Sequence, residues 1–375
     1  MDCLVTKLKG TVNDDSLLKL GELRITLPYL GKVQNLILSN DKGAVSAKII
    51  SGGALLCDME GQNGVTSKDN INGETFVKTN EGETSIMSIA DKYSLTDLSL
   101  GGYKDVEYRG IKIEGGLSAL RHCTKLKSLN VASSALTDDF SSLALLKDSL
   151  KSFVAENTVV TGNISLFENF KKLTALLLGS SRYSGTINLD NLPNLQSIGL
   201  EQNSNAIPAP FDALAGKDWA QFSFGGNYTY ETKDFSLRTY GVDGESCHIG
   251  SAFNLTITNL DGFLNDISKA SFRGVSINLK VAHGDRTSAS DTAISTLQGK
   301  NVTVTVPVAT DARTISTMSL DSGNYGIAYK DKELIVEPVD LTKMQIHPAS
   351  GVTVKTFDTK ENAEKFIEDN GLVRV

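Results

Sequence analysis

The feature that most constrains the fold of this chain is a short apolar pattern that returns at a nearly constant interval. In the stretch TKLKSLNVASSALTDDF, residues 124–140, apolar side chains stand at Leu126, Leu129 and Val131. Apolar residues recur about every 3.6 positions along an amphipathic helix and every 2 positions along a half-buried strand. A spacing of three, then two, and then a polar run fits neither for long. Each copy therefore predicts one short strand followed by a turn.

Five copies of the pattern follow one another in phase, at steps of 24, 23, 22 and 24 residues between first positions 126, 150, 173, 195 and 219. An earlier copy at Leu95, Leu98 and Leu100 stands 31 residues upstream of the first of these. Alternate residues of each strand should face a shared interior. We expect a buried ladder and an outward-facing set of neighbours: Leu129, Leu176 and Ile198 inside, and Lys127, Thr174 and Gln196 outside.

The ninth position of each copy is polar and should bond to the backbone of neighbouring coils. It is occupied by Ser134, Thr158, Ser181, Asn203 and Asn227. Farther along, TGNI (161–164) and SGTI (184–187) occupy equivalent places and predict a second strand, opened by a glycine turn, on the other side of the coil.

Self-similarity at this period with the pattern L-x-x-L-x-L is the signature of leucine-rich repeats. Residues 93–230 resemble leucine-rich repeat proteins on these copies. The resemblance implies a leucine-rich-repeat-like solenoid that presents its functional surface on the concave face. The fold class expected for the whole chain is mainly β or α+β, with a β-rich N-terminal module and a β-rich C-terminal cap.

We expect three parts: a module for attachment and oligomerisation (1–92), the repeat solenoid (93–250), and degenerate repeats with a cap (251–375). In the first part, strand-like alternation runs through Leu18, Leu20, Leu23, Ile25 and Leu27, and the polar segment 58–85 is expected to be a loop or extended arm. In the last part, the patterns predict strands over 275–281 and 302–306, a helix over 291–299, a hairpin turning at 330–332, and a helix that starts after Asp358 or Thr359 and ends at Gly371.

The N-terminal stretch LVTKLKGTVNDDSLLKLGELRI resembles the starts of virion structural proteins in crAss-like phages of gut Bacteroidales. This resemblance implies a module that docks different proteins onto a common particle. We therefore expect residues 1–92 to pair with a second subunit or another virion protein over more than about 1,000 Å². Without them, the repeats should remain folded but fail to assemble.

Charge and patterning exclude several classes of partner. A net charge of −7 and a pI near 5.3 argue against nucleic acid, which needs clustered cations. No apolar run is long enough to span a membrane. The start MDCLVTKLKG lacks an apolar signal region, so synthesis in the host cytoplasm and a place in the virion are expected. The four cysteines, Cys3, Cys57, Cys123 and Cys247, show no CxxC spacing and are expected to be reduced.

No phosphate-binding, zinc-protease or hydrolase motif occurs, so we expect no enzyme activity, no catalytic residue, no cofactor and no metal site. A zinc site joining His122-Cys123 to Cys247-His248 is the less favoured alternative, because adjacent ligands are sterically awkward. Turn chemistry explains Asp138-Asp139 better than acid/base catalysis, and 283–286 is expected to be a solvated loop. Core packing is favoured for Trp219, Phe222 and Phe224. The interaction candidates are Tyr183, Tyr228 and Tyr230, on or beside the concave rim.

The favoured function is that of a non-enzymatic phage virion structural protein, a head or tail fibre or decoration subunit that docks by its N-terminus and projects an interaction surface. Its expected partners are other virion proteins and further copies of itself, with a host-surface glycan or protein as an additional candidate. Two alternatives come from other classes: a bacterial leucine-rich-repeat adhesin or glycan-binding module, and a carbohydrate-active enzyme on a β-solenoid. The enzyme would need paired carboxylates in register along one face, a register that the repeat copies do not reveal.

Overall fold

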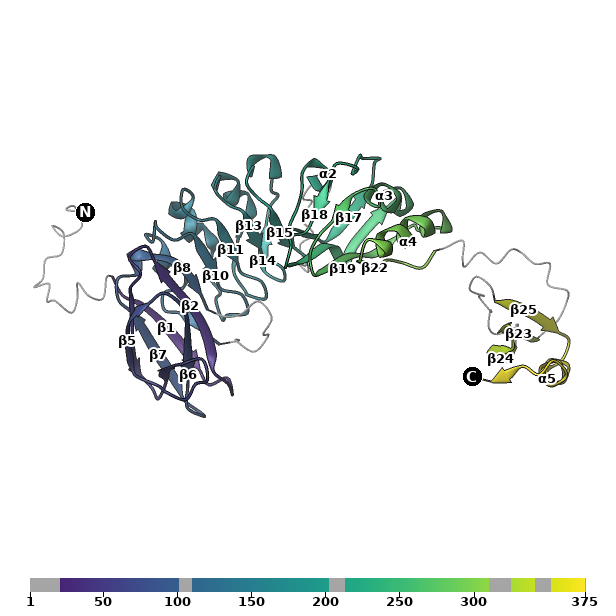
Figure 1. The fold of residues 1–375 in the computed structure, drawn as a ribbon, viewed down its shortest axis with the longest axis horizontal. Helices are drawn as coiled ribbons and strands as arrows, with labels where there is room; N and C mark the ends of the chain where they lie inside the picture. The colour runs from purple at the N-terminus through teal and green to yellow at the C-terminus, as the bar shows by residue number, and fades with distance from the viewer. Residues whose placement is uncertain (1–20, 101–109, 202–212, 310–324, 341–351, 375) are drawn as a thin grey trace, which may run out of the picture.

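The computed structural model describes residues 21–100, 110–201, 213–309, 325–340 and 352–374. The fold is rich in strands, and its largest element is an open sheet that runs the length of the repeats (Figure 1). From the first repeat onward, neighbouring strands in this sheet follow chain order and lie parallel. These strands are β8 (Leu95–Ser99), β10 (Ser128–Asn130), β11 (Ser152–Val154), β13 (Ala175–Leu177), β15 (Ser197–Leu200), β16 (Gln221–Phe224), β19 (Ser246–Thr258), β21 (Ser276–Gly284) and β22 (Val302–Thr305).

The strand register stacks equivalent apolar side chains into one continuous ladder. Leu129 pairs with Phe153, Phe153 with Leu176, and Leu176 with Ile198. All four side chains have no exposed area. The predicted phase of the repeats, with these residues in the core, is therefore confirmed. Lys127 and Gln196 are exposed and Thr174 is half-buried, as expected for positions at the sheet's edge.

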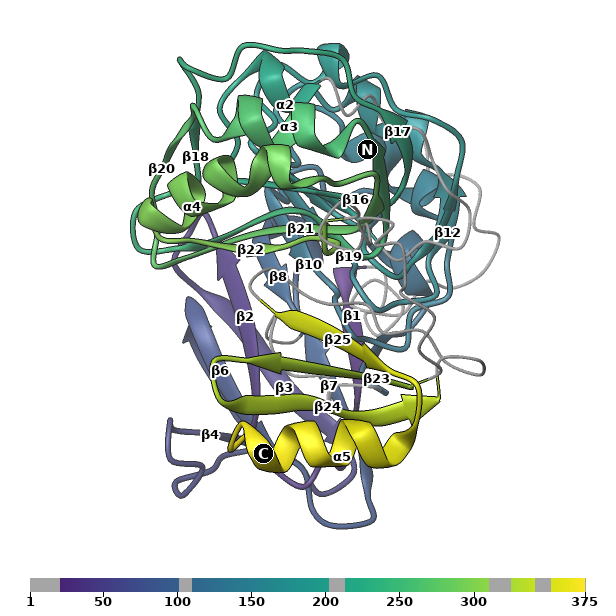
Figure 2. The ribbon, with the colours of Figure 1, turned by 90° about the vertical axis from the view of Figure 1, so that its right-hand side faces the viewer.

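Short helical turns close each coil on the side opposite the sheet's outer face. They are η4 (Gly116–Leu120), η5 (Phe140–Leu146), η6 (Ile164–Asn169), η7 (Leu189–Asn191) and α2 (Ala213–Gly216), followed by the longer α3 (Leu260–Ile267) and α4 (Asp291–Gly299). Asp139, Asn163 and Asn188 begin three of these turns, each accepting a hydrogen bond from the backbone N–H two residues on. Such caps satisfy donors that a short turn leaves unpaired. Figure 2 shows α3 and α4 lying against the last strands of the sheet.

A second, smaller parallel ladder joins β12 (Thr161–Asn163) to β14 (Arg182–Ser184). Gly162 has a φ of 133° and Gly185 a φ of 81°, a region that favours glycine. The predicted second strand is thus present. In the later copy it ends at Ser184, so most of the SGTI segment follows the strand rather than forming it.

Three of the polar ninth positions bond to backbone carbonyls, one of them to a neighbouring repeat as expected and two within their own repeat, whereas Asn227 is exposed and does not follow the expectation. The hydroxyl of Ser134 donates to Val131 O at 2.5 Å, and that of Thr158 to Ala155 O at 2.6 Å. The Ser181 hydroxyl reaches back one repeat to Ala155 O, also at 2.6 Å. All three residues are buried, so each of these bonds replaces water that the carbonyl has lost. Asn203 lies outside the described residues.

Removing the bond between repeats should weaken the fold measurably. Ser181→Ala should lower the free energy of unfolding by about 1 kcal/mol, because it leaves a buried carbonyl with one partner fewer. Ser184→Ala is the matched control, since the exposed Ser184 hydroxyl lies 3.3 Å from Gly162 O. Urea unfolding of both variants makes the comparison. Equal losses in the two variants would contradict the role given to Ser181.

The N-terminal part consists of two packed sheets. One is antiparallel, in the order β5 (Ser67–Ile71), β3 (Val45–Ser51), β7 (Thr84–Ile89), β1 (Leu23–Pro28) and β9 (Lys112–Ile113). The other contains β2 (Gln34–Asn40), β6 (Gly73–Lys78) and β4 (Leu55–Cys57). Leu23, Ile25 and Leu27 are buried in β1, as their alternation predicts, whereas Leu18 and Leu20 lie outside the described residues.

The expectation of a loop over 58–85 is wrong, because this segment contains β5, β6 and the start of β7. The physical reason is that a strand in a two-sheet sandwich needs inward side chains on one face alone. Ile71, Val77 and Met87 fill that face and are buried. Most polar residues between them are exposed, although Thr75, Thr79 and Ser85 are buried, and this polar majority makes the composition resemble that of a loop.

The two parts share one sheet. Strand β2 pairs antiparallel with β8, joining Leu38 to Leu98 at the head of the repeat ladder. The inward residues of the N-terminal sheets and of the repeats form a single core cluster. The N-terminal strands thus cover the first core face of the array, as a cap must. Removing residues 1–92 would expose that face, so the earlier expectation of a stable isolated repeat fragment loses its physical basis.

The C-terminal part begins as a continuation of the repeats. Strand β21 covers the predicted 275–281 segment, with Ile277, Leu279 and Val281 buried, although Val275 precedes the strand and is exposed. Three further short strands lie near this region: β17 (Gly226–Thr229), which pairs with β19, and β18 (Thr239–Tyr240), which pairs with β20 (Ser271–Phe272).

The division of the chain at residues 92 and 250 into functional modules stays a prediction.

Residues 325–340 and 352–374 form a unit with a core of its own, built around Ile327, Leu334, Ala363 and Ile367. It contains β23 (Tyr325–Lys330), β24 (Glu333–Asp340), β25 (Thr353–Phe357), α5 (Lys360–Asp369) and β26 (Val373–Arg374). The predicted hairpin turn is present, and Thr359 caps α5 by accepting a hydrogen bond from Asn362 N.

Candidate interaction surfaces

The three tyrosines predicted as interaction residues do not form an exposed group. Tyr183 is fully buried and donates its hydroxyl hydrogen bond to Leu200 O at 2.6 Å. Tyr230 is 5% exposed and donates to the Asp266 carboxylate at 2.7 Å. Tyr228 is half-buried, and burial raises the pKa of its hydroxyl to about 12. Tyr183 and Tyr230 are therefore core residues, which corrects the expectation that they lie at the surface, whereas Tyr228 keeps part of its side chain exposed.

Other sequence candidates also have structural roles. Cys123 precedes β10, whereas Cys247 lies in β19. Four strands lie between β10 and β19 in the sheet. At about 4.8 Å per strand, the two thiols cannot share a metal ion. The Asp138 carboxylate accepts a hydrogen bond from Ser118 N, and Asp139 caps η5, so turn chemistry accounts for this pair. Trp219, Phe222 and Phe224 are buried in the core, as expected.

The segment 283–286 is not the solvated loop that the sequence suggests. His283 and Gly284 end β21, and Arg286 is 8% exposed and paired with Asp291. Nearby, the Asp261 carboxylate accepts hydrogen bonds from Thr287 N and from the hydroxyls of Thr287 and Ser290. These contacts fasten the first turn of α3 to the connection that leads into α4.

The outer face of the sheet carries two carboxylates that the sequence interpretation did not bring together. Glu156 and Glu201 come directly after the third apolar residue of their copies, two repeats apart. Gly179 lies between them in the same position of the intervening repeat. A Cβ placed on Gly179 would lie 3.5 Å from Glu156 Oε1 and 3.5 Å from Glu201 Cγ. The absence of a side chain at this glycine lets the two carboxylates face each other.

Burial acts on both members of this pair, which we call the carboxylate pair. Burial, aided by the charge of Glu201, raises the pKa of Glu156 to about 7. Burial also raises the pKa of Glu201, although the positive charge of Lys280 opposes this. Near neutral pH the Glu156 carboxyl is therefore partly protonated and can donate a hydrogen bond, while Glu201 can accept one. Such a pair suits a ligand with hydroxyl groups.

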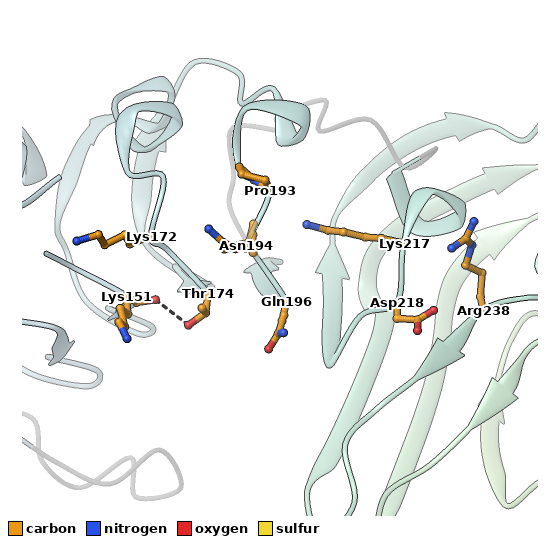
Figure 3. A pocket seen from close by; sticks show the side chains of 10 residues that line it. Lys151, Lys172, Thr174, Pro193, Asn194, Gln196, Lys217, Asp218 and Arg238 are labelled. Carbon is orange, nitrogen blue, oxygen red and sulfur yellow. Dashed lines mark hydrogen bonds between the residues drawn. The ribbon is translucent and has the colours of Figure 1, made fainter. Parts of the chain in front are cut away.

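A second surface lies where the chain turns into each strand. An open cleft of about 730 Å³ crosses four neighbouring repeats there, and we call it the basic cleft (Figure 3). Its charged lining consists of four cations and one carboxylate: Lys151, Lys172, Lys217, Arg238 and Asp218. Asn194, Gln196 and Thr174 contribute polar side chains between them. The lining is thus positive, although the whole chain carries a net charge of −7.

The contacts of these side chains differ. Within the part of the chain that the structure describes, no ion pair holds the exposed Lys151 and Lys172. Lys217 extends toward the preceding repeat, where its ammonium group lies 3.3 Å from Leu192 O and 4.5 Å from the centre of the Trp219 ring. Burial lowers the pKa of Lys217. The Nε of Arg238 is buried and has no hydrogen-bond partner among the described residues.

Both surfaces could have been found in the sequence by aligning the copies on their apolar residues. Lysines stand directly beside the first apolar residue in three successive copies, at Lys125, Lys127, Lys151 and Lys172. The two glutamates stand directly after the third apolar residue in alternate copies. The information about both surfaces therefore lies in the residues that flank the apolar positions, and the sequence interpretation considered the apolar positions alone.

No protein-family model matches this chain, and no curated protein matches it in sequence. Among solved structures, the chain is similar to an internalin from Listeria monocytogenes, with 15% identity and a TM-score of 0.30. That match covers 58% of this chain and 84% of the internalin. Among the described residues, no helix combines the length and apolar character needed to cross a bilayer.

Proposed function

We propose that this protein is a non-enzymatic binding scaffold of a phage particle, built as a leucine-rich-repeat solenoid. The observation that carries the proposal is the single parallel ladder from β8 to β22, which holds the outer side chains of successive repeats at fixed spacing. Adjacent strands lie about 4.8 Å apart, so a ligand that spans several repeats meets a regular array of groups. Repeat arrays use extended surfaces of this kind for recognition.

The N-terminal resemblance to virion structural proteins supports the assignment of this chain to a phage particle. In this proposal the chain is a fibre or decoration subunit that associates with other virion proteins and with copies of itself. Because the N-terminal sheets are continuous with the repeats, attachment through that end would hold the whole array in a fixed direction. The alternative, a bacterial adhesin or glycan-binding module, shares the binding surface but differs in where the protein resides.

Purified particles provide the test of location. Mass spectrometry of particles banded in a density gradient should detect this chain at a constant ratio to the major capsid protein. An antibody against the chain should label the particles in electron micrographs. Detection of the chain in the host envelope, with none in the particles, would favour the adhesin.

The proposed lack of catalysis has its own test, because a pair of carboxylates is what acid/base hydrolysis of glycans requires. We expect no release of reducing sugar from any polysaccharide tested with the whole chain. Activity that disappears in both Glu156→Gln and Glu201→Gln would contradict the proposal and assign the carboxylate pair to catalysis.

A further inference from the structure

We propose that the basic cleft binds a linear glycan that carries carboxylate or sulfate groups. This inference rests on the proposed function, since it specifies the ligand of the binding scaffold. The first argument is charge. Four of the five charged residues in the lining are cations, in a chain whose overall charge would repel an anion. A local excess of positive charge on an acidic protein attracts anionic ligands to that place alone.

The second argument is the state of the cations. Surface lysines often pair with carboxylates of their own chain, as Lys125 does with Asp41 at 2.9 Å. Within the described residues, the exposed ammonium groups of Lys151 and Lys172 have no such pairing. An anionic group in the cleft would supply the missing counter-charge.

The third argument separates a glycan from other polyanions. Between the cations lie the uncharged side chains of Thr174, Asn194 and Gln196. The Asn194 amide nitrogen donates to Lys171 O at 2.7 Å, which holds this amide group in place in the lining of the cleft. Amides and hydroxyls of this kind bond well to sugar hydroxyls. Single-stranded nucleic acid would need exposed aromatic rings for stacking, but Trp219 is 1% exposed.

An acidic peptide fits less well for a related reason. Peptide recognition relies on apolar anchors that fill pockets. The apolar lining here is Pro193 and Leu195, and Leu195 is 1% exposed. The cations instead come from several successive repeats, which suits an extended chain that carries several anionic groups.

The experiment is isothermal titration of the whole chain with polygalacturonate, dextran sulfate and neutral dextran at low ionic strength. We expect binding of at least one anionic glycan, no binding of dextran, and weaker binding as salt rises. Comparing polygalacturonate with dextran sulfate shows which anionic group is preferred. Poly(dT) and polyglutamate serve as competitors and should displace the glycan poorly.

Two charge-reversal pairs with the same change in net charge make the matched comparison. Lys151→Glu with Lys172→Glu should lower affinity at least about tenfold, because both exposed cations line the cleft and the change reverses their charge. Lys48→Glu with Lys78→Glu, on exposed positions of the N-terminal sheets, should change affinity by less than about twofold. Circular dichroism melting confirms that each pair remains folded.

A loss that is equal in the two pairs would overturn the inference, as would tighter binding of poly(dT) or polyglutamate than of either glycan. Absence of binding to both anionic glycans would also overturn it. None of these results would affect the location of the chain in particles, so failure of the inference remains distinguishable from failure of the proposed function.

Discussion

Truncation of Leu176 to alanine should lower the free energy of unfolding by roughly 2 to 5 kcal/mol. Leu176 has no exposed area and sits in the middle of the ladder, between Phe153 and Ile198. Each repeat contacts its neighbours alone, so a cavity in a central repeat weakens two interfaces at once. Urea denaturation of the whole chain measures the effect.

Leu237→Ala is the matched control for this truncation, because the Leu237 side chain is 83% exposed. The control should change stability by less than about 0.5 kcal/mol. If Leu176→Ala cost no more than Leu237→Ala, the register of the repeat ladder would be wrong.

Replacement of Glu156 by glutamine should stabilise the protein at about pH 8 by roughly 3 kcal/mol and have little effect at about pH 4. The sign follows from the raised pKa of about 7 in the folded state against an ordinary value of 4.5. Below the ordinary value both states are protonated. As pH rises between the two values, the unfolded chain loses its proton first, so the folded state loses stability until pH passes about 7. The glutamine side chain does not ionise, so the variant does not lose stability in this pH range.

The charged and polar groups around Glu156 determine how strongly its pKa, and so the stability of the protein, responds to its environment. Glu201 lies on the other side of Gly179, and its negative charge raises the pKa of Glu156. The positive charge of Lys280 acts on Glu201. The Gln221 amide nitrogen and Glu156 Oε1 both lie close to Gly199. Glu231→Gln, at an exposed position, is the control. A difference between Glu156→Gln and the parent that is the same at both pH values would refute the assigned environment of the carboxyl.

The sequence interpretation succeeded where a local pattern is sufficient. The copies at 126, 150, 173, 195 and 219 set the phase of the core, and the structure confirms that phase at Leu129, Leu176 and Ile198. Capping at Thr359 and the hairpin at 330–332 were also predicted correctly. In each case the signal lies within a few residues, because strand alternation, caps and turns are properties of short segments.

The interpretation failed where the outcome depends on which segments meet. The polar composition of 58–85 did not reveal strands that bury one face in a sandwich. Tyr183 and Tyr230 were predicted to be surface residues, but in the structure neighbouring repeats bury them. Pairing of β2 with β8 joined two parts that the sequence pattern separates. Long-range pairing of this kind cannot be recognised in either segment alone, because the hydrogen bonds and packing depend on residues of both strands.

The sequence by itself determined the repeat, its period and its core residues, because a repeat array is specified by contacts between successive copies of one short pattern. The tertiary structure alone decided what the outer positions do. It brought Glu156 and Glu201 together across a glycine, and it gathered lysines and an arginine from separate repeats into one cleft. The physical reason is that burial and Coulomb interactions act through space. The environment of each charge is therefore set by stacked strands and not by its neighbours in the chain.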